Sequence, residues 1–220
     1  MMTNLFSTFD PATSIKMSLN WISSMLCLFM IPMYFWKLPN RMEKIIMEFM
    51  LTMHSEFKTL NNKSKGLTLM MISLMMMILM NNMMGLLPYM FTSSSHLLFT
   101  LTLALPMWIS LMIFGWINNT NHMFSHLIPN GTPPILMPFM VLIETTSNLI
   151  RPGSLAVRLT ANMIAGHLLM TLLGNNIMES SIKVLILIIQ MGLMSFEMAV
   201  ALIQSYVFSV LMTLYSSETM

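Results

Sequence analysis

Charged side chains are scarce in this chain of 220 residues. Lysine, arginine, aspartate and glutamate make up 8% of it, whereas 56% is hydrophobic. A soluble domain carries about 25% charged residues, because its surface faces water. The composition therefore excludes an ordinary soluble domain and indicates an integral membrane protein, with residues 1–220 forming a single membrane domain.

Cysteine and concentrated positive charge are also lacking. The single cysteine, Cys27, lies in an apolar run, so the chain has no internal disulfide framework and the redox compartment cannot be inferred. The net charge is only +2, and the basic residues are few and clustered in one loop, so no nucleic-acid partner is expected. His122 and His126 stand four residues apart, but no acid or cysteine accompanies them in their loop. We therefore expect neither a metal site nor a cofactor.

Long apolar runs are what the sequence does contain. Residues 14–36 are predicted to form a first membrane span, with Trp21 and Trp36 suited to the membrane interface. Residues 67–117 hold two further spans, 67–91 and 97–117. Residues 40–60 differ, because apolar side chains recur at helical spacing among charged ones, which predicts an amphipathic helix on the membrane surface.

The distribution of basic residues predicts the orientation. Six of the ten basic residues lie between the first two spans: Lys37, Arg41, Lys44, Lys58, Lys63 and Lys65. The positive-inside rule places this region on the matrix or cytoplasmic side and the N-terminus on the opposite side.

The last third of the chain is too long to cross a membrane upright. Residues 135–173 are nearly continuously apolar, and as a helix they would extend roughly 58 Å against a hydrocarbon thickness of about 30 Å. Such a helix must lie strongly tilted, or break near residues 151–153. The same holds for residues 182–215, which follow a predicted polar turn at 174–176. We therefore predict a long, strongly tilted helical hairpin over 135–215.

Charged and amide side chains inside this hairpin are its most informative feature. An arginine at the bilayer centre costs at least about 2.5–3.5 kcal/mol, which makes Arg158 a candidate functional residue. On each arm three polar residues are spaced by seven, nearly two helical turns, so they form one stripe: Glu144, Arg151 and Arg158, and then Gln190, Glu197 and Gln204. Facing stripes predict a proton-conducting seam. The alternative is a structural clasp between Arg158 and Glu197.

The motifs of the hairpin resemble a known family. Leu-Ala-Val-Arg-Leu-Thr-Ala-Asn at 155–162 is followed by Ala-Gly-His at 165–167, and Ile-Glu-Thr at 143–145 precedes it. Phe-Glu at 196–197 and Gln-Ser-Tyr-Val-Phe at 204–208 complete the pattern. Together they resemble subunit a of the mitochondrial F-type ATP synthase. The content of 32 methionines is similar to that of invertebrate versions.

The resemblance implies a stator subunit without an active site of its own, which passes protons to the carboxylates of a rotating c-ring. Arg158 would face the ring and block direct leakage between two offset half-channels. The other implied proton-translocation residues are His167 and Glu197 in the intermembrane-space half-channel, Glu144 in the matrix half-channel, and Asn162 and Gln204 near the rotor. His167 lies nine residues from Arg158, about 180° around a straight helix, so we expect it to face Glu197.

The resemblance also implies partners and a location. The expected partners are the c-ring, the peripheral-stalk subunit b, the small subunit 8, other membrane-sector subunits and the lipid bilayer, with cardiolipin as a candidate lipid. The expected location is the mitochondrial inner membrane, crossed several times, with the N-terminus in the intermembrane space. Arg151 departs from the neutral polar residue expected in many relatives, and it would either add positive charge near the matrix half-channel or pair with Glu144.

Three other function classes predict different features. A haem-carrying subunit requires histidine pairs deep in the spans, and only His167 is clearly deep, which excludes it. A secondary transporter predicts internal repeats, whereas the intramembrane charges are confined to the last third of the chain. A purely structural membrane subunit remains the alternative that proton flux would distinguish.

Overall fold

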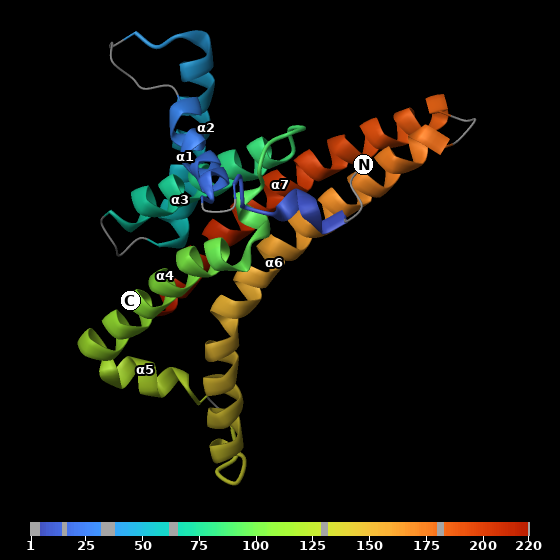
Figure 1. The fold of residues 1–220 in the computed structure, drawn as a ribbon. Coiled ribbons are helices and arrows are strands. Elements are labelled where there is room, and N and C mark those ends of the chain that lie inside the picture. Colours follow the sequence, from blue (N-terminus) through green and yellow to red (C-terminus); the bar gives the residue numbers. More distant parts are fainter. Residues whose placement is uncertain are drawn as a thin grey trace.

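The computed structural model describes residues 5–14, 17–31, 38–61, 66–128, 132–179 and 183–219, and within them every regular element is a helix. The all-α prediction is therefore confirmed. Four described helices are long and apolar enough to cross a membrane: α3 (Leu67–Gly85), α4 (Leu97–Asn118), α6 (Met137–Glu179) and α7 (Lys183–Thr219). Figure 1 shows α6 and α7 extending side by side, with the other helices gathered around one part of the pair.

The N-terminal helices are short. The 3₁₀-helix η1 (Leu5–Phe9) precedes a second one, η2 (Leu19–Ile22), which leads directly into α1 (Ser23–Met30). Together η2 and α1 cover 12 residues of the predicted span 14–36, fewer than the roughly 20 that a full crossing needs. Residues 15–16 and 32–37 of that span lie outside the described residues.

The predicted surface helix is present as α2 (Arg41–Leu60). It starts at a capping box, in which the Asn40 backbone N–H donates to Glu43 Oε2 at 2.8 Å. Its second half packs against the core formed by α3 and α7, and Phe57 is completely buried there. At the other end of α2, Met42 and Ile45 remain exposed. The spanning helices therefore fix α2 mainly through its C-terminal half.

Replacing Phe57 with alanine is expected to reduce assembly of the membrane sector. The change leaves a cavity where a fully buried ring was, and a phenylalanine-to-alanine change of this kind costs about 3–5 kcal/mol. Leu51→Ala on the same helix is the matched control, because Leu51 is 59% exposed. The amount of assembled complex in membranes measures the effect, and equal amounts for both variants would contradict it.

The helix α3 lies at the centre of the packing and ends earlier than predicted. It stops at Gly85, and turns at residues 86–89 lead to the short 3₁₀-helix η3 (Ser93–Ser95). Pro88 accounts for the difference from the predicted end at 91, because proline cannot donate the backbone hydrogen bond that continues a helix. The core beside α3 is completed by residues of α4, α6 and α7, among them Ala104, Leu111, Ala156, Phe208 and Met212.

The helix α4 is followed by the short helix α5 (Thr120–His126). On α5 the ring nitrogens Nε2 of His122 and His126 lie 3.2 Å apart, and both side chains are exposed. No third histidine, cysteine or acid joins them within the described residues to form a metal-binding group.

The hairpin of α6 and α7 is longer than predicted. Its first arm has 43 residues, about 64 Å at helical rise, and it continues through Pro152. Figure 1 shows that α6 bends, which an internal proline explains because it removes one backbone hydrogen bond. The predicted turn at 174–176 is wrong, because α6 continues to Glu179. Glycine and asparagine weaken a helix by about 1 kcal/mol or less each, and extending a formed helix is easy.

Candidate functional site

Arg158 lies on an exposed face of α6, in the middle of the hairpin. Its helical neighbours Leu155 and Leu159 are 5% and 3% exposed and hold this part of α6 against the core. Within the described residues Arg158 makes no ion pair, so the alternative, a structural clasp with Glu197, is not formed. The arginine is therefore presented outward rather than used to join the two arms.

Gln204 of α7 shares this face. Arg158 and Gln204 line one small depression, together with apolar residues of both arms. Asn162 follows Arg158 by one turn of α6 and is half-buried. The hairpin thus brings together a cation and an amide that are 46 positions apart in the sequence.

Glu197 precedes Gln204 by seven residues on α7 and is 7% exposed. Its carboxylate packs directly over Gly166 of α6, so closely that a Cβ added at position 166 would overlap the carboxylate atoms. Glycine costs about 1 kcal/mol relative to alanine inside a helix. This position requires glycine because it lets an acid of α7 lie against the backbone of α6.

His167 follows Gly166 and bonds to a third helix. Its Nε2 lies 2.7 Å from the carbonyl oxygen of Gly85 at the end of α3, and its ring meets Phe9 edge-on at 6.0 Å. Because a carbonyl only accepts, Nε2 carries the proton in this bond. The prediction was that His167 faces Glu197, but its hydrogen bond goes to α3, and none joins it to Glu197 in the described chain.

Buried polar residues surround the end of α3 near this histidine. Six residues of α3 and the segment around η3 are at most 5% exposed: Asn81, Asn82, Thr92, Ser93, Ser94 and Ser95. The hydroxyl of Ser93 donates to Asn81 Oδ1 at 3.4 Å, and the hydroxyl of Thr92 donates to Ser95 Oγ at 3.1 Å. The helix η3 contacts α6. These hydroxyls and amides therefore form a polar region beside the His167 end of the site.

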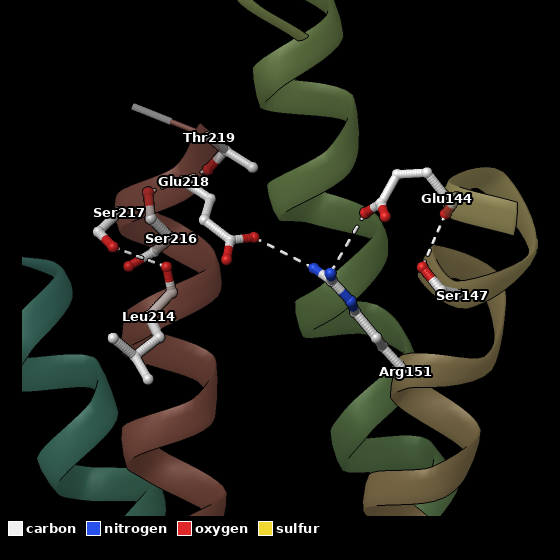
Figure 2. A network of polar contacts seen from close by, with 8 residues as sticks. All are labelled: Glu144, Ser147, Arg151, Leu214, Ser216, Ser217, Glu218 and Thr219. Atoms are coloured by element: carbon white, nitrogen blue, oxygen red, sulfur yellow. Dashed lines mark hydrogen bonds and ion pairs between the residues drawn. The ribbon is translucent and has the colours of Figure 1, made fainter. Parts of the chain in front are cut away.

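Glu144 lies toward the other end of α6. Figure 2 shows its carboxylate facing Arg151, whose Nη2 is 3.3 Å from Glu144 Oε1. The second terminal nitrogen of Arg151, Nη1, is 3.1 Å from Oε2 of Glu218 on α7. The arginine also lies over the ring of Tyr215, 5.0 Å from its centroid.

These side chains line a cavity of about 660 Å³. Its wall includes Glu144, Arg151 and Glu218, and also Asn148 and His126. A half-open space of this size with acids in its wall can hold water and can take up or release protons.

The acids are well separated from Arg158 along α6. Glu144 precedes Arg158 by 14 residues, about 21 Å along a helix, and Gly166, on which Glu197 packs, follows it by eight residues, about 12 Å. The structure therefore places one acid group on each side of the central arginine and joins neither of them to it.

Sequence reasoning missed three contributors. Gly166 was part of a motif but had no role, although glycine inside a long apolar helix is a signal of close approach. Glu218 lies near the C-terminus, outside the predicted hairpin, and only its ion pair with Arg151 in the structure shows that it belongs to the site. Gly85 contributes a backbone carbonyl, which no side-chain pattern can indicate.

Comparison with known proteins shows the family of this chain. Residues 17–217 match the family described as ATP synthase A chain. The chain belongs to this family. It is 62% identical to "ATP synthase subunit a" of Anopheles gambiae and of Aedes aegypti, and 60% identical to that of Locusta migratoria, in each case over 99% of both chains.

Membership in the ATP synthase A chain family settles the broad function. The chain is a stator subunit of the membrane sector of an ATP synthase, and it takes part in proton translocation. Its long apolar helices make it a multi-pass membrane protein, and its relatives named here come from insects, in agreement with the predicted invertebrate version.

Proposed function

We propose that the two acid groups flanking Arg158 belong to two offset proton half-channels. Glu197 and His167 line one half-channel, and Glu144 with its cavity forms the other. Protons reach the rotor carboxylates from one side and leave to the other, and the turning of the c-ring carries them between the half-channels. Arg158 separates the two, with Gln204 and Asn162 beside it at the rotor face.

The observation that supports this most is the isolation of Arg158. It is exposed in the middle of a long apolar hairpin, and no acid of the described chain neutralises it. A charge in a membrane is costly unless it has a partner or a use. A passing carboxylate on another subunit supplies a partner of the right charge, and a fixed cation repels protons that would cross directly.

The orientation follows from the basic residues. The region around α2 carries Arg41, Lys44 and Lys58 within the described chain, so it lies on the matrix side and the N-terminus lies in the intermembrane space. Following the helices from α2, the cavity at Glu144 then opens toward the matrix, and Glu197 and His167 lie toward the intermembrane space of the mitochondrial inner membrane.

The proposed partners are those that membership in the family implies. The c-ring lies against the exposed face that bears Arg158 and Gln204. Subunit b, subunit 8 and lipid, including cardiolipin, cover other apolar surfaces of the chain. The subunit holds no active site of its own, because nucleotide chemistry takes place elsewhere in the ATP synthase.

Glu144→Gln tests the matrix half-channel. Glutamine keeps the shape of the side chain but cannot release a proton, so proton-driven ATP synthesis per assembled complex should fall by about tenfold or more. Glu48→Gln on α2 is the control, because that acid is exposed and pairs only loosely with Lys44, at 3.9 Å. Normal synthesis in assembled Glu144→Gln complex would remove this acid from the pathway.

A further inference from the structure

Arg151 connects both arms of the hairpin at the cavity. On one side it bonds Glu144, seven residues earlier on α6, and on the other it bonds Glu218 near the end of α7. The aromatic ring of Tyr215, also on α7, lies below the guanidinium. Three contacts to two helices fix the position of one cation, which is 29% exposed.

The shape of the guanidinium suits this arrangement. Nη1 bonds one acid at 3.1 Å and Nη2 bonds the other at 3.3 Å, so each carboxylate has its own nitrogen. Both contacts are hydrogen bonds between opposite charges, although each is longer than the roughly 2.7–2.9 Å of the strongest bonds of this kind. Lysine has a single compact head group and cannot reproduce a planar fork between two acids.

The carboxylate that Arg151 holds on α6 is the one that lines the cavity. The Glu144 side chain is 36% exposed and would otherwise be free to change rotamer along the cavity wall. Its other neighbours on the wall include Asn148 and His126, for which no bond to Glu144 is formed within the described chain. The ion pair to Arg151 is therefore the contact that fixes its direction.

We propose that Arg151 is a positioning residue for proton transfer through Glu144. It holds the Glu144 carboxylate at the wall of the cavity, and Glu218 and Tyr215 on α7 hold Arg151 in turn. The inference rests on the proposed function of Glu144 and adds that the end of α7 sets the geometry of an acid on α6.

The first test replaces Arg151 in the complete ATP synthase in its membrane. Arg151→Gln should lower ATP synthesis per assembled complex by roughly three- to tenfold, the loss expected for a partly exposed charge-assisted contact. Arg151→Lys should restore only part of the rate. Glu218→Gln should cost less than Arg151→Gln, because Arg151 still reaches Glu144. Arg41→Gln, which removes an exposed arginine of α2, is the matched control.

A double-mutant cycle separates positioning from a merely structural role. Glu144→Asp keeps an acid but withdraws it from Arg151, so it should reproduce the defect of Arg151→Gln. The double variant should then be no worse than either single variant, because both remove the same contact. The proposal would be overturned if the double variant lost activity by the product of the two single losses. Full activity in Arg151→Lys would also overturn it, as would a loss of synthesis that only follows the amount of assembled complex.

The two proposals can fail separately. Normal synthesis in Glu144→Gln would contradict the matrix half-channel and with it the role of Arg151. A strong defect in Glu144→Gln together with normal rates in Arg151→Gln would leave the half-channel in place and overturn the positioning role alone.

Discussion

Replacing Arg158 with alanine is expected to abolish coupled ATP synthesis while the complex still assembles. The side chain is exposed and makes no ion pair within the described chain, so its loss leaves the packing of the hairpin intact. A preorganised charge that stabilises another charge contributes about a hundredfold or more to a rate. Because the barrier between the half-channels is then gone, passive proton leakage through the membrane sector should rise. Synthesis and proton permeability, measured in the same membranes, test both effects.

Arg158→Lys distinguishes a barrier from a structural tie. If the rotor carboxylate needs a delocalised cation that can follow its movement, the compact and strongly hydrated ammonium of lysine should also fail severely. A structural clasp with Glu197 predicts that lysine would still pair and keep much of the activity, but the structure does not form that clasp. Near-normal coupled synthesis in this variant would refute the barrier mechanism, and Arg41→Lys provides the control for the change of side chain.

The helices could be predicted from sequence because apolar length and helical spacing decide them. The amphipathic pattern from residue 40 to 60 places α2 within one residue of its observed start, and the excess length of the last third requires a tilted hairpin. Turns were harder to predict. Gly174, Asn175 and Asn176 have the composition of a turn, but local preference of about 1 kcal/mol per residue does not end a long helix.

The site residues on regular spacing could also be predicted, whereas their partners could not. The interval of seven relates Glu144 to Arg151, and the structure forms that pair at 3.3 Å. The seven-residue interval gives no information about Glu218, whose position depends on how far α7 extends. Likewise, the helical periodicity of residues 158–167 predicts that His167 points away from Arg158. Only tertiary packing brings the carbonyl oxygen of Gly85 to 2.7 Å from Nε2 of His167.

Glu197→Gln is expected to reduce proton-driven ATP synthesis by about a hundredfold, because an acid that must exchange protons contributes on that scale. Glutamine has nearly the same volume, so it can occupy the space over Gly166 and assembly should be unaffected. His167→Ala should have a milder effect, since its ring bonds a backbone carbonyl rather than Glu197. Unchanged proton flux in assembled Glu197→Gln complex would exclude this acid from the pathway.

A pair of glycine variants tests whether the position of Glu197 matters as well as its acidity. Gly166→Ala adds one methyl group where the carboxylate lies and must displace it, so synthesis should fall several-fold although every ionisable group is retained. Gly192→Ala adds the same group on α7, where the structure has open space, and should leave the rate unchanged. Both substitutions raise helix propensity by about the same amount, so a difference between them reports the contact with Glu197 and not the stability of the helix. Equal rates in the two assembled variants would show that the carboxylate can move without loss, and the close packing over Gly166 would then have no part in proton transfer.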